Sequence, residues 1–385
     1  MGELFELTDG CPDNAIIKVI GVGGGGGNTV KQMVSAGIEG VEFICANTDR
    51  QHLEGCNADV ILPIGEQITR GLGAGMDPEI GRQSAIEDAD RIREALHGAD
   101  MLFITAGMGG GTGTGAAPVV AEIAKELGIL TIAVVTKPFT FERKKRMEVA
   151  NQGIAALEQF VDSLIVIPNE RLLSVLGKST SLKQAFAAAN NVLQNSVNGI
   201  ADLITRHGAM NVDFADVKKV MQARGMSMIG MGSAKGENRA QEAAEMALTS
   251  PLLEDLNLTG AQGMLVNITA AGEDDIELCE FHTVNELVSE VASDDALVIV
   301  GTAFDPSMGD ELRVTVVATG LGGATPKLRS VTPVTRSDSG EPNYGELDKP
   351  TVIRRSATHR NIDASSEAID MDYLDVPAFL RHQAD

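Results

Sequence analysis

The first half of the chain alternates short apolar runs with segments whose apolar residues recur every three or four positions. The short runs predict β-strands and the segments between them predict helices. Strands and helices in strict alternation build a parallel sheet covered on both faces, so we expect an α/β domain over residues 14–180. Ligands of such sheets bind at the carboxyl ends of the strands. The predicted strands are 16–20, 41–46, 58–62, 101–105, 130–135 and 163–167.

A single stripe of apolar and small residues continues through residues 181–206. A helix of this length spans about 37 Å at 1.5 Å per residue, enough to cross a domain. We therefore predict a long central helix between two halves of the protein.

Residues 207–325 predict a second, smaller α/β domain with some antiparallel pairing. We expect Met226, Met228 and Met231 to fill its core rather than form a ligand cluster. The predicted strands are 226–231, 264–269, 296–303 and 312–319, and the predicted helices are 237–249 and 284–292.

Both ends of the chain lack this patterning. Residues 1–13 predict a short flexible tail, and residues 326–370 have the polar, aperiodic composition of a disordered linker. Apolar residues return in 371–385. An apolar segment on a flexible tether is typical of a short linear motif that binds a partner. The alternative is an apolar tail that associates non-specifically.

Two glycine-rich segments, 21–27 and 107–115, each follow a predicted strand and precede a predicted helix (28–36 and 116–127). Glycines let successive backbone N–H groups converge, and the helix that follows points the positive end of its dipole at the same spot. Thr112 and Thr114 add hydroxyl donors. A flexible turn would explain one such loop, but two on the strand ends of one α/β unit predict a site for the polyphosphate of a nucleotide.

Other nucleotide-binding patterns fit less well. Residues 21–26 match the dinucleotide pattern GxGxxG, and Asp49 ends the next strand, which would indicate an NAD-binding enzyme. Five consecutive glycines match almost any glycine pattern, however, and a dinucleotide fold does not call for the second loop. A Walker-type loop fails because Leu172 stands where the motif around Lys178 needs glycine.

Charge narrows the possible ligands. The chain of 385 residues carries a formal net charge of −23, which argues against nucleic acid because a phosphate backbone is bound through Lys and Arg. A phosphate site here must rely on backbone amides and a metal ion. The four cysteines show no CxxC pair or zinc spacing, so we expect a reduced, cytoplasmic protein. We expect no signal peptide and no membrane span, so that any membrane contact goes through a partner.

Two further features could complete a nucleotide site. The glycine cluster 71–75 is by itself an ordinary turn, but beside two anion loops it could close over a terminal phosphate. Glu142 and Arg146 are four residues apart, and an exposed helical ion pair would explain that spacing adequately.

An aromatic and amide face could hold a purine. Asn169 follows a predicted strand, and Phe186 and Asn190 share one face of the central helix by their i, i+4 spacing. Such a face is suited to stacking on a purine and reading its edge. Simple core packing is the alternative for Phe186.

The segment Asn211-Val212-Asp213-Phe214-Ala215-Asp216 places two carboxylates at the start of a predicted helix, 214–223. The plain interpretation is that Asp213 caps the helix and Asp216 complements its dipole. The functional interpretation is a pair of carboxylates that polarises water. Both are far in sequence from the phosphate loops, so a catalytic role would imply a site shared between two molecules.

Together these segments resemble the FtsZ family of bacterial tubulin-like cell-division GTPases over residues 14–323. The loop 109–115 resembles the tubulin-type signature, 211–216 resembles the family's synergy loop, and 374–380 resembles its partner-binding tail. The resemblance implies a GTP-binding domain, a central helix and an activation domain, which stack head to tail into the protofilaments of the cytokinetic ring.

The resemblance also implies roles for single residues. Asp213 and Asp216, together with Asn211, would reach into the next subunit and activate the attacking water, and Asn47 and Asp49 would line the nucleotide and its Mg²⁺. The residues implied to bind GTP or GDP are Gly24, Gly25, Asn47, Asp49, Ala74, Gly75, Gly109, Gly110, Gly111, Thr112, Gly113, Thr114, Glu142, Arg146, Asn169, Phe186 and Asn190.

The implied partners are further copies of the chain, division regulators, and membrane anchors such as FtsA and ZipA that would bind residues 371–385. The protein would then act at mid-cell on the inner face of the membrane without inserting into it. Arg143 stands where many relatives have glycine, and Asn190 replaces an aspartate of some relatives. A homologue that binds GTP and assembles without hydrolysis is the other alternative, which Asp213 and Asp216 oppose.

Overall fold

The computed structural model describes residues 15–38, 40–176, 180–206, 208–223, 225–253, 260–293 and 295–321. Their strands form one ten-stranded sheet in the order β3-β2-β1-β4-β5-β6-β7-β10-β8-β9. The predicted parallel sheet is confirmed, because the neighbours from β3 to β6 all pair in parallel. The strands are β1 Ile17–Val22, β2 Val41–Asn47, β3 Val60–Pro63, β4 Met101–Gly107, β5 Leu130–Lys137, β6 Ser163–Pro168, β7 Met226–Lys235, β8 Gly263–Ala270, β9 Leu297–Phe304 and β10 Glu311–Leu321.

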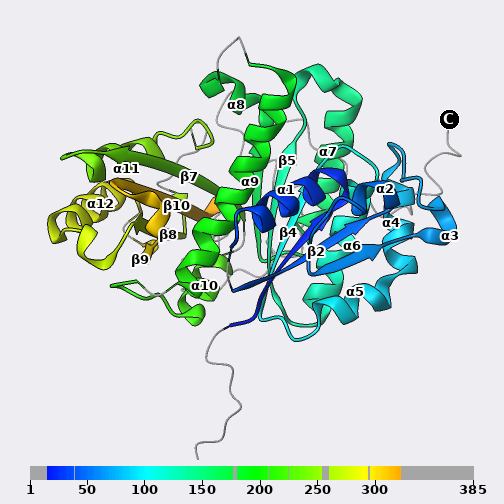
Figure 1. Cartoon of the computed structure of the whole chain (residues 1–385), viewed down its shortest axis with the longest axis horizontal. Helices are drawn as coiled ribbons and strands as arrows, with labels where there is room; N and C mark the ends of the chain where they lie inside the picture. The colour runs from blue at the N-terminus through cyan, green and yellow to red at the C-terminus, as the bar shows by residue number, and fades with distance from the viewer. Residues whose placement is uncertain are drawn as a thin grey trace, which may run out of the picture. The chain divides into compact units, whose positions relative to one another are not determined.

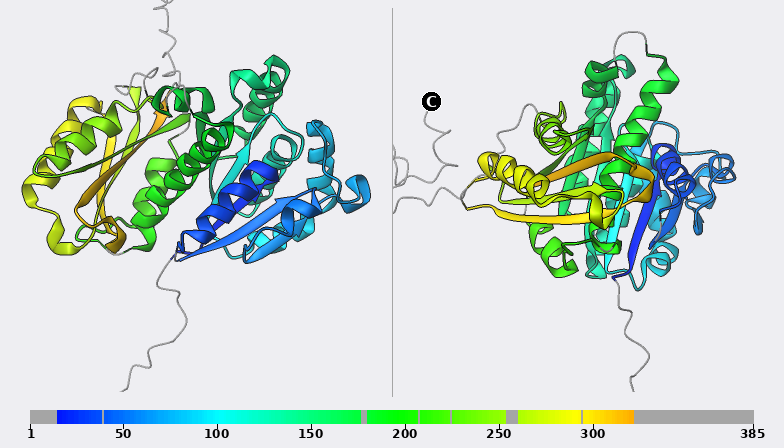
Figure 2. Two further views of the ribbon diagram at one scale, coloured as in Figure 1. Left: turned by 45° about the horizontal axis from the view of Figure 1, so that its top comes forward. Right: turned by 60° about the vertical axis from the view of Figure 1, so that its left-hand side comes forward.

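Helices cover both faces of this sheet (Figures 1 and 2). Every residue of β1 is buried, which explains why the central strands read as continuous apolar runs. Val19 belongs to the apolar cluster under α1 and α9, and Ile20 to the cluster under α6. The helices are α1 Gly23–Ser35, α2 Arg50–Leu53, α3 Glu66–Thr69, α4 Pro78–Glu87, α5 Ala89–Leu96, α6 Thr112–Glu126, α7 Lys144–Leu157, α8 Asn169–Leu176, α9 Leu182–Thr205, α10 Phe214–Met221, α11 Arg239–Leu248 and α12 Leu278–Val291, with 3-10 turns η1 Thr140–Glu142, η3 Glu273–Asp275 and η4 Pro306–Met308.

The long central helix is confirmed as α9. It starts with a capping box, in which Ser181 Oγ accepts from Gln184 N–H at 3.3 Å and Gln184 Oε1 accepts from Ser181 N–H at 2.9 Å. The helix lies beside α1 on one side, and Asn267 Nδ2 of β8 donates to the carbonyl of Gly199 at 3.0 Å on the other (Figure 1). One continuous helix therefore touches both halves of the sheet.

The predicted antiparallel pairing is also confirmed, because β10 pairs antiparallel with both β7 and β8. The two halves meet where β6 and β7 pair at only two positions, Leu164 with Met226 and Ile165 with Ser227. Met226 is 41% exposed, so the expectation that it fills the core was wrong, whereas Met228 is buried.

The predicted glycine loops are shorter than expected. Helix α1 begins at Gly23 and α6 begins at Thr112, so most of the glycines of the first segment form helical turns. A Cβ placed on Gly26 would lie 2.2 Å from the carbonyl oxygen of Thr105, so only glycine lets α1 approach β4 this closely. Close packing thus overrides the weak helix propensity of glycine.

The predictions for residues 1–13, 326–370 and 371–385 lie outside the described residues. Within the described part of the chain, no helix is both long and apolar enough to cross a membrane.

Candidate functional site

The carboxyl ends of β1 and β4 bring the two glycine segments together. The strands are neighbours in parallel register, so the segments that follow them leave the sheet at the same edge. A Cβ on Gly23 would lie 2.8 Å from the amide nitrogen of Gly113, and one on Gly25 would lie 3.0 Å from that of Gly107. The N-terminal ends of α1 and α6 therefore converge on one place, as an anion site requires.

Some glycines of this edge have no packing reason to be glycine. No described atom lies within 4 Å of a Cβ placed on Gly110, and only the imidazole of His52 lies near one on Gly24, at 3.9 Å. By contrast, a Cβ on Gly115 would lie 1.9 Å from the carbonyl oxygen of Pro78. Neither Gly24 nor Gly110 has a positive φ. The open space at these two positions fits a ligand that approaches the backbone.

The third glycine cluster closes the same edge. A Cβ on Gly111 would lie 3.0 Å from Cβ of Ala74 and 2.9 Å from the carbonyl oxygen of Gly75. The carbonyl of Thr48 holds this segment by accepting from Gly73 N–H at 3.1 Å and from the hydroxyl of Thr69 at 3.2 Å. The cluster is therefore not an isolated turn but part of the glycine-lined edge.

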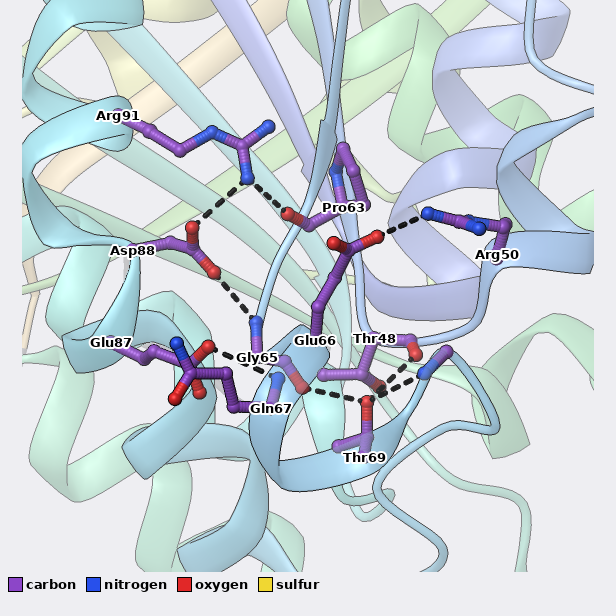
Figure 3. A network of polar contacts seen from close by, with 11 residues as sticks. Thr48, Arg50, Pro63, Gly65, Glu66, Gln67, Thr69, Glu87, Asp88 and Arg91 are labelled. Carbon is purple, nitrogen blue, oxygen red and sulfur yellow. Dashed lines mark hydrogen bonds and ion pairs between the residues drawn. The ribbon is translucent and has the colours of Figure 1, made fainter.

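A polar network supports the segment that leads to this cluster (Figure 3). Asp88 Oδ2 accepts from Gly65 N–H at 2.7 Å, where the backbone turns through φ 67°. Arg91 Nη1 donates both to Asp88 Oδ1 and to the carbonyl of Pro63, each at 2.9 Å. These bonds anchor the end of β3 and the start of the segment to the first turn of α5.

Two polar side chains stand at the end of β2. Asn47 is buried, and its Oδ1 lies 3.3 Å from the backbone nitrogen of Asp49. Asp49 Oδ1 accepts from the N–H groups of Gln51 and His52 at 3.0 and 3.3 Å and so caps α2. The described residues contain no group of three or more His, Cys, Asp or Glu that could hold a metal ion.

The face expected to hold a purine has an unpaired buried amide. Asn169 is 4% exposed at the end of β6, and its Oδ1 has no hydrogen-bond partner among the described residues. Phe186 is 40% exposed and meets the edge of the buried Phe139 ring at 5.4 Å, so simple core packing does not describe it. Asn190 Oδ1 lies 3.5 Å from Thr29 Oγ1 of α1. An exposed ring and an unsatisfied amide are what a stacked, hydrogen-bonded base would complete.

Glu142 and Arg146 do not form the exposed helical pair of the plain interpretation. Glu142 precedes α7 and lies in the turn η1. Its side chain is only 10% exposed, with Oε2 at 3.1 Å from Arg146 Nη1 and Oε1 accepting from Phe139 N–H at 2.9 Å. A Cβ on Gly109, which has φ 97°, would lie 2.8 Å from Cγ of Arg146. The pair therefore flanks the second glycine segment.

The threonine hydroxyls, expected as open donors, are engaged within the protein. Thr114 Oγ1 is buried and accepts from Gly109 N–H at 2.8 Å, and Thr112 Oγ1 lies 2.6 Å from Thr48 Oγ1. Sequence reasoning passed over Thr48 and His52. Thr48 lies between two residues that it did select, whereas His52 carries no signal because its place over Gly24 and Gly27 depends on how α2 packs against α1.

The structure does not bring the acid pair to this edge. Asp213 occupies the N-cap position of α10, but its carboxylate makes no capping hydrogen bond, so helix capping does not explain it. Asp213 and Asp216 are both exposed. They follow the C-terminal end of α9, whereas Phe186 lies in its second turn, about 30 Å away at 1.5 Å per residue (Figure 1). One chain therefore separates its acids from its glycine-lined edge.

Comparison with known proteins decides the family. Residues 16–177 match the model of the Tubulin/FtsZ family, GTPase domain, and residues 225–322 match that of the FtsZ family, C-terminal domain. The cell division protein FtsZ of Coxiella burnetii is 59% identical over 385 residues, which cover 98% of this chain and 99% of that protein. The chain belongs to the FtsZ family. The cell division protein FtsZ of Pseudomonas aeruginosa is 54% identical over 397 residues, covering 99% of this chain and all of that protein.

Solved structures agree with this membership. The empty FtsZ dimer of M. jannaschii superposes with a TM-score of 0.77 at 46% identity, covering 80% of this chain and 88% of that chain. The GDP-bound monomer of CetZ1 from Haloferax volcanii has a TM-score of 0.69 at 22% identity, which shows a shared fold. As a member of the FtsZ family, the protein is a cell-division GTPase that binds GTP and GDP. Nothing in these comparisons favours an NAD-dependent enzyme.

One residue of this FtsZ-family chain holds a backbone conformation that suits only glycine. Arg143 has φ 79° and ψ 158°, in a region that costs other residues about 1–3 kcal/mol. We expect Arg143→Gly to raise the free energy of unfolding by about 1 kcal/mol, because glycine removes this strain but adds about 0.4–1 kcal/mol of unfolded-chain entropy. Urea denaturation measures the change. Arg143→Ala keeps the Cβ and should gain nothing; an equal gain would attribute the effect to the lost charge instead.

Proposed function

We propose that the protein is a filament-forming GTPase of the cytokinetic ring, in which GTP is hydrolysed between two subunits stacked head to tail. The observation that carries the proposal is the separation of the glycine-lined edge from the exposed acid pair at the far end of α9. Head-to-tail stacking would place the acids of one subunit over the nucleotide of the next. A heterologous contact that does not close generates a filament. The FtsZ dimer of M. jannaschii supports self-assembly.

The nucleotide would lie along the carboxyl ends of β1, β2, β4 and β6. Backbone N–H groups of the glycine segments would bind its phosphates, while Ala74 and Gly75 would approach the terminal one. Glu142 and Arg146 would contact the ribose and phosphate, and Asn169, Phe186 and Asn190 would hold the guanine. The phosphate-binding residues are Gly24, Gly25, Gly109, Gly110, Gly111, Thr112, Gly113 and Thr114, of which the buried Thr114 would act through its backbone.

The residues at the end of β2 fit a magnesium ion that arrives with the nucleotide. Asn47 and Asp49 supply an amide and a carboxylate oxygen at this place. Mg²⁺ usually takes one or two carboxylates together with phosphate oxygens. When bound, it would neutralise part of the phosphate charge.

The acid pair would act on water. Asp213 and Asp216 would orient a water molecule and accept a proton from it, with Asn211 beside them. As that water attacks the γ-phosphorus, the bond from this phosphorus to the β–γ bridging oxygen breaks and GDP leaves. Positioning and general-base catalysis of this kind contribute about 10²–10⁴-fold in rate. The backbone amides around the phosphates would bind the developing negative charge.

The tail would connect the filament to the membrane. We infer that residues 371–385 bind anchors such as FtsA and ZipA, and that the filament also meets division regulators at mid-cell on the inner face of the membrane. A peptide of residues 371–385 should therefore compete with the full chain for such an anchor. If truncation before residue 371 left anchor binding unchanged, this part of the proposal would be wrong.

The dependence of GTP hydrolysis on protein concentration tests whether the site is shared between subunits. We expect the rate of GTP hydrolysis per molecule, measured with Mg²⁺, to be near zero at low protein concentration and to rise steeply above a threshold. The physical reason is that neither subunit alone has both the nucleotide and the acids. Phosphate release across a dilution series, with sedimentation on the same samples, shows whether the two thresholds coincide. A rate per molecule independent of concentration would mean that each chain hydrolyses GTP alone.

A further inference from the structure

The end of β9 holds the C-terminal end of α9 through one guanidinium. Arg206, the C-cap residue that follows α9, places Nε at 2.9 Å from Asp202 Oδ1 in the last turn of the helix. Its Nη1 donates to the carbonyl of Phe304 at 2.9 Å and lies 3.8 Å from Asp305 Oδ1. A single side chain thus joins the helix to the last residue of β9 and the one after it.

The loop before the acid pair is attached to the same strand. Met210 N–H donates to Thr302 Oγ1 at 2.9 Å, and Thr302 N–H donates back to the carbonyl of Met210 at 3.1 Å. A Cβ on Gly208 would lie 1.8 Å from the carbonyl oxygen of Thr302, and one on Gly301 would lie 2.5 Å from Cγ2 of the buried Val212. Neighbouring positions of β9 therefore anchor both the loop and the end of α9.

The carboxylates around Arg206 need its charge. Asp202 is 9% exposed, and burial raises its pKa, which the charges of Arg206 and Arg313 oppose. Burial also acts to raise the pKa of Asp305, but hydrogen bonds from Ser307 and the charges of the same two arginines outweigh it, so that pKa is lowered. Moving Arg206 away would leave the buried carboxylate of Asp202 without a compensating charge. The contact therefore favours the one arrangement of the end of α9 in which Arg206 faces Asp202 and Asp305.

We propose that Arg206 is a positioning residue for the acid pair, fixing the end of α9 on β9 so that Asp213 and Asp216 enter the neighbouring subunit's site in one geometry. The proposal rests on the shared site proposed above. A misplacement of about 1 Å can cost roughly 100-fold in rate. Helix α9 also contacts α1, which begins at the glycine-lined edge. Arg206 therefore fixes the positions of Asp213 and Asp216 relative to the rest of their own subunit.

Mixing two disabled chains tests this role. The first chain carries Gly110→Ala, so that it keeps its acids but holds little nucleotide at a GTP concentration well below its raised Kd. The second carries Asp216→Asn, so that it keeps its nucleotide but lacks an acid. Each alone should be inactive, and the mixture should hydrolyse GTP where the first chain's acids meet the second chain's nucleotide. Adding Arg206→Gln to the first chain should lower the mixed rate about 10-fold or more. Adding it to the second chain should leave the rate unchanged.

Controls separate positioning from general damage. Arg206→Lys retains the charge beside Asp202 and should restore part of the rate. Arg93→Gln in the first chain removes an arginine that also pairs with two carboxylates, Asp90 at 3.2 Å and Glu126 at 2.8 Å, but far from β9, and should have no effect. In the otherwise unmodified chain, Arg206→Gln should lower kcat while the Kd for GTP stays the same.

The outcomes distinguish the two proposals. An equal loss from Arg206→Gln in either chain, or no loss in the first chain, would overturn the positioning role while leaving the shared site intact. If the mixture without any Arg206 change were inactive although both chains co-sediment, the shared site itself would fail.

Discussion

Asp216→Ala is expected to lower the rate of GTP hydrolysis about 100-fold or more, while GTP still binds and filaments still assemble. The carboxylate is exposed on the first turn of α10 and lies about 30 Å along α9 from the nucleotide edge of its own chain. Removing it should therefore leave the binding of GTP untouched. What is lost is the group that orients water and takes its proton, a contribution of about 10²–10⁴-fold.

Three measurements on the same protein separate these effects: phosphate release, GTP affinity by filter binding, and sedimentation of filaments. Asp90→Ala is the matched control, because Asp90 is also an acid in the first turn of a helix and its side chain is fully exposed. That variant should hydrolyse GTP at the unmodified rate. Turnover at the wild-type rate in Asp216→Ala would show that Asp216 has no part in hydrolysis. Loss of GTP binding would show that Asp216 contributes to the nucleotide site of its own chain.

Gly110→Ala should weaken nucleotide binding roughly 10- to 100-fold without unfolding the protein. Its Cβ would enter space that no described protein atom fills, and its backbone does not have positive φ, so the folded chain can accept a methyl group there. A bound phosphate would occupy the same space. Each hydrogen bond to a charged group contributes about 1.5–3 kcal/mol, and 1.4 kcal/mol is tenfold in affinity, so losing one raises the Kd for GTP roughly 10- to 100-fold.

Substitutions of two other glycines serve as comparisons for Gly110→Ala. Gly260 also has no described atom within 4 Å of its Cβ position, and Gly260→Ala should change neither GTP affinity nor stability. Gly26→Ala should instead lower the free energy of unfolding by about 1–3 kcal/mol or more, because the new methyl group would collide with the carbonyl of Thr105. Equilibrium titration with a fluorescent GTP analogue and thermal melts distinguish the three. Unchanged GTP affinity in Gly110→Ala would mean that phosphate does not lie there.

The sequence was sufficient for the elements whose local signals and burial agree. Residues 17–22 are apolar except for Lys18 because β1 is covered on both faces, and Ser181 and Gln184 mark the start of α9 by their mutual hydrogen bonds. The carboxyl-end rule for parallel sheets then placed both glycine segments on one edge, where the structure brings them into contact.

Features that depend on packing between distant segments were not predictable in this way. Local propensity did not predict that α1 would start at Gly23, because the contact that requires glycine at position 26 is with β4. The burial of the Glu142 side chain and the exposure of Phe186 are likewise set by neighbouring elements. The sequence around Asp213 also fits a helix N-cap, so it did not predict that the carboxylate makes no capping hydrogen bond. The roles of these residues toward nucleotide stay predictions.

The two-pair junction of β6 and β7 also has a mechanical meaning. In a filament whose load enters through the nucleotide edge of one subunit and leaves through the acid loop, tension crosses every subunit between its two halves. A ladder of two residue pairs offers little resistance to shear compared with the seven of β4 and β5. The load would then pass mainly through helix α9 and through the apolar cluster that the two halves share, so that packing around α9, more than the hydrogen bonds of the sheet, would keep the two ends of a subunit in register under tension.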